Sequence, residues 1–280
     1  MPLSLICPPI SLPPFSLLYN KAGPVFSNYI LFRNGEIQLL TIPRIPRLHQ
    51  LHRVSLVPCS TSDVMLGFYR NQSGSGLEKY YLMIEEWLKL DVPAEDNRPL
   101  VIQADGGVGK KTLLVKWYEY HQSLHGGRRS NDLIILHFAT TGGNNSNYFY
   151  AIYRILIKLR EELNIDQKVE LHEEKLRKYF AYWLDVCNQR IENQAIKNLD
   201  VLYNKIILVF EGIDYFMDRN TGREGNIAFW LPKCFPKNVK VIVTADRESE
   251  SMRYFTRLGC PRVNIPYDVT IMRSMVRAHL

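Results

Sequence analysis

Cysteine is scarce in this chain: the 280 residues include five, widely separated and without a Cys-x-x-Cys pair. An odd number of scattered cysteines argues against a disulfide-stapled secreted scaffold and indicates free thiols in a reducing compartment. The apolar residues 1–20 lack the basic start and small-residue cleavage site of a signal peptide, and prolines interrupt them. Neither a cleaved signal nor a membrane span is expected. We therefore expect a cytoplasmic protein.

A dense run of basic residues interleaved with aromatics is also missing, although the formal charge is +7. No specific nucleic-acid partner is expected, because solvated surface charge explains this pattern. His121 and His125 have helical i, i+4 spacing, but no carboxylate or cysteine completes a ligand set, so we interpret both as surface histidines. The sequence contains no internal repeat of any period.

The chain is expected to have two parts, a proline-rich, basic extension and linker (1–76) and a globular domain (77–280). Nine of the fifteen prolines lie in residues 1–60, which predicts poor order there. Phe26–Thr41 predicts a hairpin around the Asn34-Gly35 turn. Asn71–Gly76 has the composition of a flexible linker, which sets the predicted boundary.

Strands and helices alternate in the second part, which is typical of an α/β fold with a parallel sheet and helices on both faces. The predicted strands are Leu100–Gln103, Leu133–Phe138, Ile206–Phe210, Val239–Thr244 and Arg262–Ile265. The predicted helices are Leu77–Leu88, one from Lys111, Tyr148–Leu163, Leu176–Gln194 and Val269–Ala278, with a polar loop at Gly142–Asn147.

The segment Leu100–Tyr120 reads as a strand, a glycine-rich turn with two lysines, and a helix. Glycines lack Cβ, so the turn can direct consecutive N–H groups at one anion, and the start of a helix adds further donors. A nearby lysine can reach the β and γ phosphates of a nucleotide. The candidate cofactor-binding residues are Gly106, Gly107, Val108, Gly109, Lys110, Lys111 and Thr112. The alternative is a structural turn with solvated lysines.

The phosphate-loop pattern G-x-x-x-x-G-K-[ST] fits this turn in two imperfect registers. If Gly109-Lys110 is the Gly-Lys pair, Ala104 replaces the first glycine and Lys111 replaces the hydroxyl residue. If Lys111-Thr112 is the Lys-Thr pair, Lys110 replaces the second glycine and Asp105 the first. Thr112 is the candidate metal ligand in this second register.

The strand Ile206–Phe210 is fully apolar and leads into Glu211, which is the form of a Walker B element. A carboxylate at such a strand end can hold Mg²⁺ through a water molecule. Asp214 is placed to orient or deprotonate an attacking water. We take Glu211 and Asp214 as candidate catalytic residues and Glu211 as a candidate metal ligand. The alternative is that both side chains cap the strand and open a turn.

Arg247 follows the fourth predicted strand and is a further candidate for cofactor binding, because a guanidinium there can contact a terminal phosphate. A surface ion pair with Asp246 or Glu248 is an equally good interpretation.

Together these stretches resemble a NACHT-type domain of the STAND branch of P-loop NTPases, and the nephrocystin and tetratricopeptide-repeat group in particular. Three segments show the resemblance: Leu100–Trp117, Ile206–Asp214 and Trp230–Thr244. It implies a three-layer P-loop sandwich with strand order 5-1-4-3-2, and ATP or ADP with Mg²⁺ as ligand. It also implies Gly107, Gly109 and Lys110 around the phosphates, Lys111 and Thr112 near the magnesium, and Glu211 and Asp214 as the acidic pair.

The departures from the family pattern are Ala104 for glycine, Lys111 for serine or threonine, and Glu211 for aspartate. They predict slow or absent hydrolysis, so the chain is at most a slow ATPase. The resemblance implies a regulatory or scaffold role with protein partners and self-association. The family's lid and repeats are not recognised, so we expect a C-terminally truncated member. The alternatives are a nucleotide-free interaction remnant and, less favoured, a P-loop small-molecule kinase.

Overall fold

The computed structural model describes residues 26–33, 36–43, 61–70, 76–124, 131–141, 143–170, 172–196, 203–216, 227 and 230–267. The chain divides into two compact units, Met1–Asn71 and Gln72–Leu280. The division falls at the start of the glycine- and serine-rich segment Asn71–Gly76. The predicted helix Val269–Ala278 lies outside the described residues.

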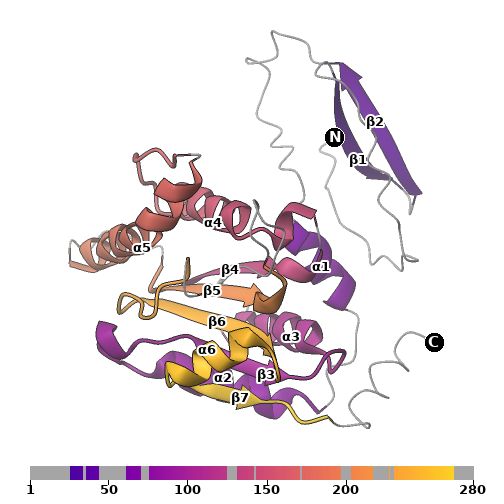
Figure 1. Ribbon diagram of the computed structural model, residues 1–280. Helices are drawn as coiled ribbons and strands as arrows, with labels where there is room; N and C mark the ends of the chain where they lie inside the picture. The colour runs from indigo at the N-terminus through magenta and orange to yellow at the C-terminus, as the bar shows by residue number, and fades with distance from the viewer. Residues whose placement is uncertain are drawn as a thin grey trace. The chain divides into compact units, whose positions relative to one another are not determined.

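The first unit contains a hairpin and a helix. Strands β1 (Phe26–Arg33) and β2 (Glu36–Pro43) pair antiparallel (Figure 1). In their register Arg33 lies opposite Glu36. The predicted hairpin is thus confirmed. Helix α1 (Thr61–Arg70) was not predicted.

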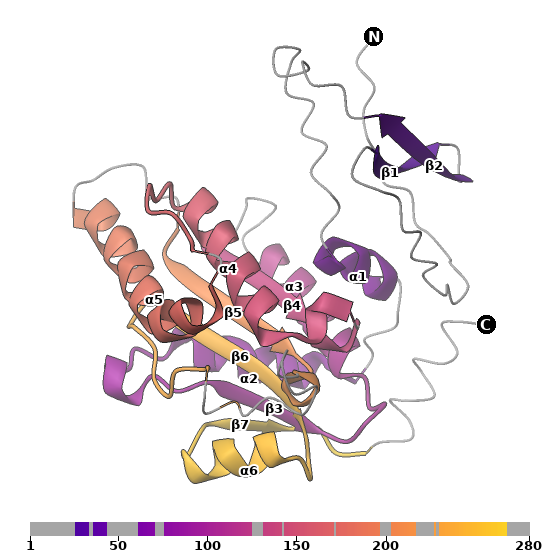
Figure 2. The ribbon, with the colours of Figure 1, turned by 45° about the horizontal axis from the view of Figure 1, so that its top comes forward.

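The second unit is built on a five-stranded sheet whose neighbouring strands all pair in parallel. Its order is β4-β5-β6-β3-β7 (Figure 2), which confirms the predicted order 5-1-4-3-2 when read from the β7 edge. The strands are β3 (Leu100–Ala104), β4 (Asp132–Phe138), β5 (Lys205–Glu211), β6 (Val239–Asp246) and β7 (Arg262–Asn264).

Helices connect these strands, and none of the described ones is long and apolar enough to cross a membrane. They are α2 (Glu78–Lys89), α3 (Lys110–Ser123), α4 (Tyr148–Glu162), α5 (Glu173–Ile196) and α6 (Glu250–Arg257). Helix α6 was not predicted because it has only eight residues. Ser249 is its N-cap: the Ser249 hydroxyl accepts a hydrogen bond from the Met252 N–H at 3.1 Å. Such a cap stabilises a short helix.

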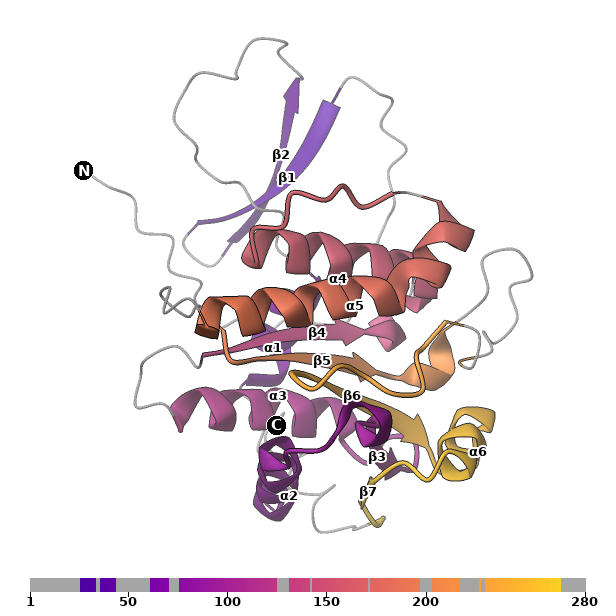
Figure 3. The ribbon, with the colours of Figure 1, turned by 90° about the vertical axis from the view of Figure 1, so that its left-hand side faces the viewer.

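Two layers of helices cover the two faces of the sheet. Ile206, Leu208 and Phe210 of β5 share one hydrophobic cluster with buried residues of α4, α5 and α6, whereas the intervening Ile207 and Val209 are buried outside it. Since successive side chains of a strand point to opposite faces, α4–α6 cover one face. Helices α2 and α3, whose buried residues lie outside that cluster, contact each other and cover the other face. Figure 3 shows α4 and α5 side by side.

A buried polar network holds α3 in place. The Glu85 carboxylate of α2 accepts from Trp117 Nε1 at 2.7 Å and lies 2.9 Å from His121 Nδ1. The other ring nitrogen of His121 lies 3.4 Å from Asp132 Oδ2 on β4. His121 is only 3% exposed, so its assignment as a surface histidine was wrong. Burial alone would lower the pKa of His121, but hydrogen bonds and charge from Asp132 and Glu85 outweigh it and raise the pKa to about 9.

This network predicts that the free energy of unfolding falls as the pH rises from about 6.5 to 9. The pKa of His121 is higher in the folded chain than in the unfolded one, so its contribution is complete below the unfolded value and is lost as pH passes the folded value. The full effect is on the order of 3 kcal/mol. Urea unfolding across this pH range should show the fall in the free energy of unfolding for the native chain. The control variant His172→Gln, at an exposed site, should show the same fall. A His121→Asn variant that kept the fall would contradict the assignment.

Candidate functional site

The turn between β3 and α3 folds tightly because two of its glycines adopt backbone angles that other residues avoid. Gly107 has φ of 80° and Gly109 has φ of 93°, both in the left-handed region. Val108 between them is 1% exposed, so its side chain packs inward. Helix α3 starts directly after Gly109, at Lys110.

Lys110 bends back over this turn instead of extending into solvent. Its Nζ donates to the backbone oxygens of Ala104 at 3.1 Å and Asp105 at 2.9 Å. The same atom forms an ion pair with Asp246 Oδ1 at 2.5 Å, at the end of β6. The ammonium therefore lies across the loop, where the Gly109-Lys110 register expects it. Thr112, the hydroxyl residue of the other register, is 2% exposed within α3.

Glu211 ends β5 and is almost entirely buried, with 3% of its surface exposed. The Thr140 hydroxyl donates to Glu211 Oε2 at 2.5 Å. Burial raises the pKa of Glu211, and this effect exceeds the lowering by the Thr140 hydrogen bonds and by the charges of Lys111 and Lys110. The carboxyl group is thus held at the carboxyl end of the sheet, within the electrostatic reach of the two lysines.

Asp214 lies in a short 3-10 turn, η4 (Ile213–Tyr215), just beyond β5. Its Oδ2 accepts from the backbone N–H of Asp246 at 2.6 Å. Its Oδ1 is buried and has no hydrogen-bond partner among the residues that the structure describes. One oxygen therefore fixes the side chain to β6 and the other remains able to accept a hydrogen bond.

Arg247 connects the loop to the edge of the sheet. Its Nε donates to Asp105 Oδ1 at 3.1 Å, and its Nη2 donates to the Ile265 oxygen at 3.4 Å, after β7. Asp246 and Glu248, the expected partners for a surface ion pair, were the wrong choice. Arg247 also lines a cavity of about 540 Å³ together with three further arginines. These are Arg253, Arg257 and Arg262. Glu250 also lines this cavity and pairs with Arg253, so its lining carries a net positive charge.

The structure thus brings together the loop, Glu211, Asp214 and Arg247, because β5, β6 and β3 are neighbours and their carboxyl ends meet at one edge. Sequence analysis missed three side chains in this assembly: Asp246 opposite Lys110, Thr140 on Glu211, and Thr244. The Thr244 hydroxyl accepts from the Gly212 N–H at 2.8 Å. Thr244 and Asp246 are polar residues at the end of an apolar strand, which was the available signal. Nothing local points to Thr140.

The residues at the loop do not fit a divalent cation in the usual way. The position after Lys110 holds Lys111 where a hydroxyl ligand is expected, Thr112 is buried, and Glu211 already accepts from Thr140. Magnesium prefers an octahedron of oxygen ligands. Here the first two residues of α3, Lys110 and Lys111, place two ammonium groups at the loop instead of oxygen ligands. The predicted metal role of Thr112 and Glu211 is therefore not carried further.

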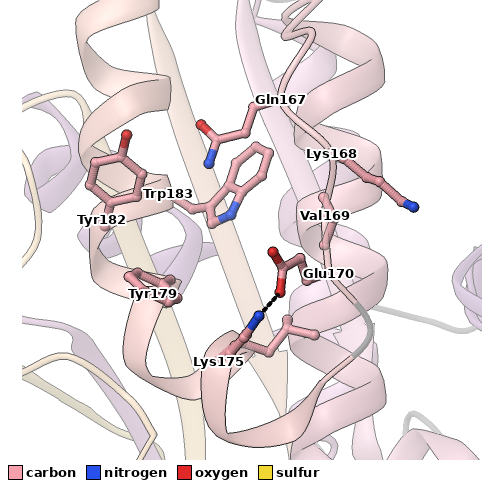
Figure 4. A pocket seen from close by; sticks show the side chains of 9 residues that line it. Gln167, Lys168, Val169, Glu170, Lys175, Tyr179, Tyr182 and Trp183 are labelled. Carbon is pink, nitrogen blue, oxygen red and sulfur yellow. Dashed lines mark hydrogen bonds and ion pairs between the residues drawn. The ribbon is translucent and has the colours of Figure 1, made fainter.

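A second hollow lies on α5, away from the candidate residues. It has a volume of about 350 Å³ and is lined by Gln167–Glu170 and by α5 side chains that include Tyr179, Tyr182 and Trp183 (Figure 4). Lys175 and Glu170 form an ion pair of 2.6 Å there, fully exposed to solvent. Exposed pairs contribute little, and no candidate site residue lines this hollow.

Comparison with known proteins gives one distant relative, and no family model matches. A TPR repeat-containing protein of Dictyostelium discoideum is 23% identical over 211 residues, which cover 66% of this chain and 12% of the relative. The chain therefore spans a small part of the relative that it matches. TPR repeats also characterise the group that the sequence resembles.

Solved structures with a similar course of the chain include three ORC proteins. Drosophila ORC bound to DNA has a TM-score of 0.42 with 14% identity and covers 82% of this chain and 54% of its own. Aeropyrum pernix ORC2, in ADPNP–ADP complexes, has 0.38 with 11% identity and covers 72% and 50%. Aeropyrum pernix ORC1 in complex with DNA has 0.38 with 14% identity and covers 72% and 47%.

The turn after Glu211 generates a prediction about stability. Gly212 has φ of 72°, and a Cβ there would lie 2.5 Å from Thr140 Cγ2. Gly212→Ala should therefore lower the free energy of unfolding by roughly 1–3 kcal/mol, because Thr140 must leave Glu211. Gly106→Ala, with no heavy atom within 4 Å of the added carbon, should change it by less than about 0.5 kcal/mol. Equal losses in the two variants, measured by urea unfolding, would refute this account.

Proposed function

We propose that the second unit binds ATP or ADP in the loop between β3 and α3, as a NACHT-like module of the STAND branch. The observation that supports this most is the position of Lys110, whose ammonium lies over the loop and touches two of its carbonyls. Around Lys110 the unit supplies further groups that can bind a polyphosphate. These are the glycine-rich turn, the positive end of helix α3 and the neighbouring Lys111 ammonium.

The Lys110 ammonium is neutralised by Asp246 at 2.5 Å. A β or γ phosphate that enters the loop offers oxygens in place of this carboxylate, so Lys110 exchanges one anion for another. Asp246 then remains beside the phosphate as an uncompensated negative charge. Binding in this site is therefore opposed by the ion pair between Lys110 and Asp246.

Hydrolysis is proposed to be slow or absent. Attack on a γ phosphate requires a positioned, activated water and neutralisation of charge on the phosphate. Asp214 has one oxygen committed to the Asp246 N–H, and Glu211 is buried against Thr140. The module therefore holds nucleotide rather than turning it over. We further propose a regulatory or scaffold role in the cytoplasm, with protein partners and self-association.

The proposal predicts saturable binding of ATP and ADP to the full chain by isothermal titration calorimetry. Lys110→Ala should weaken binding roughly ten- to hundredfold, because it removes charge-assisted hydrogen bonds to phosphate. Lys116→Ala, on the same helix and paired with Glu119 at 3.0 Å, is the matched control and should bind as the native chain does. If the native chain binds neither nucleotide, the interaction-only alternative replaces this proposal.

The exchange at Lys110 predicts that Asp246→Asn binds nucleotide several-fold more tightly. The amide releases the ammonium and removes a negative charge beside the phosphate. Asp91→Asn, which breaks an exposed ion pair with Lys237 at 3.2 Å, should leave the affinity unchanged. Weaker binding by Asp246→Asn, in a variant that melts at the native temperature, would show that Asp246 assists binding instead of opposing it.

A further inference from the structure

The residue that follows Lys110 is the most unusual feature of the loop. Lys111 is the second residue of α3, it is partly exposed, and it occupies the position of the hydroxyl residue in the Gly109-Lys110 register. Among the described residues its ammonium has no hydrogen-bond or ion-pair partner. Lys110, in contrast, has three partners. The Lys110 ammonium is thus held by the protein, and the Lys111 ammonium is available to a ligand.

The surroundings of Lys111 favour an anion and disfavour a metal. Its charge, like that of Lys110, acts on the buried carboxyl group of Glu211, so the two ammonium groups and this carboxyl share one region. A divalent cation placed there would meet two positive side chains and the positive end of α3. The Glu211 carboxyl group accepts a hydrogen bond from the Thr140 hydroxyl, and the Asp246 carboxylate is paired with Lys110. A phosphate meets the same groups as attractive partners.

We infer that Lys111 takes the place of the divalent cation, so that this loop binds a nucleoside di- or triphosphate without magnesium. The inference rests on the proposed nucleotide site. A lysine ammonium is a compact cation with three donors on a flexible stem, and it binds phosphate as a point charge. The ligand is then the metal-free polyphosphate, whose negative charge Lys110 and Lys111 offset in part.

A preference between the two nucleotides follows. Triphosphates chelate magnesium more strongly than diphosphates, because they carry more charge. Excess magnesium therefore removes more of the free ATP than of the free ADP. A site that takes the metal-free form loses apparent affinity for ATP when magnesium is added, and loses less for ADP.

The test is calorimetric titration of the full chain with ATP and with ADP, once in EDTA and once in excess magnesium chloride. For the native chain we expect a higher affinity in EDTA than in magnesium, with the larger difference for ATP. Lys111→Ser restores the Gly-Lys-Ser pattern and should bind about tenfold or more weakly in EDTA, with recovery in magnesium. Lys116→Ser on the same helix is the control for removing a lysine from α3.

The outcomes separate this inference from the proposed function. Binding by the native chain that is no tighter in EDTA than in magnesium overturns the role of Lys111 and leaves the nucleotide site intact. Equal binding in EDTA by the native chain and a normally melting Lys111→Ser variant also overturns it. No binding under either condition ends both proposals.

Discussion

The Lys110 ammonium joins segments that are far apart in the chain. It contacts the end of β3, the first residue of the loop and the end of β6, 136 positions away. This contact is possible because β3 and β6 pair in parallel with Ala104 opposite Asp246. The same edge receives Glu211 and Asp214 from β5. Without this pairing the glycine turn would be an isolated loop with no acidic partner for its lysine.

The surrounding structure keeps that edge rigid. The Glu85 carboxylate and the Asp132 carboxylate hold His121 from two directions, so α3 is fixed to α2 and to β4 by buried polar contacts. Fixing α3 also fixes its first residues, which carry both lysines. On the other side of the loop, Arg247 joins Asp105 to the end of β7. The loop is therefore restrained at both ends before any ligand arrives.

Charge at the site is divided between the two lysines and three carboxyl groups. Asp246 neutralises Lys110, Asp214 is held by a backbone N–H, and Glu211 is buried. Lys111 has no such partner among the described residues, and this asymmetry distinguishes the loop from one that is built around a metal. The residue behind this asymmetry is a lysine at the position where the phosphate-loop pattern has serine or threonine.

The sequence by itself determined the architecture of the second unit. Its apolar runs and the glycine turn predicted the five strands, and the resemblance implied their order, because strand, turn and helix signals are local and repeat along the chain. The sequence also indicated Glu211 and Asp214 as candidate site residues, because acidic residues directly after an apolar strand form a local pattern. The short helix α6 escaped because eight residues carry little periodicity.

Only the tertiary structure decided which side chains meet. Lys110 pairs with Asp246, and Thr140 donates a hydrogen bond to Glu211. Each contact joins segments that are far apart in the sequence. The burial of His121 likewise results from packing between different helices and strands. Such contacts depend on the register and neighbours of strands, which no local pattern encodes. The two registers of the loop could be compared only in the tertiary structure. The comparison rests on Lys110, and not Lys111, turning back over the loop, and on the burial of Thr112.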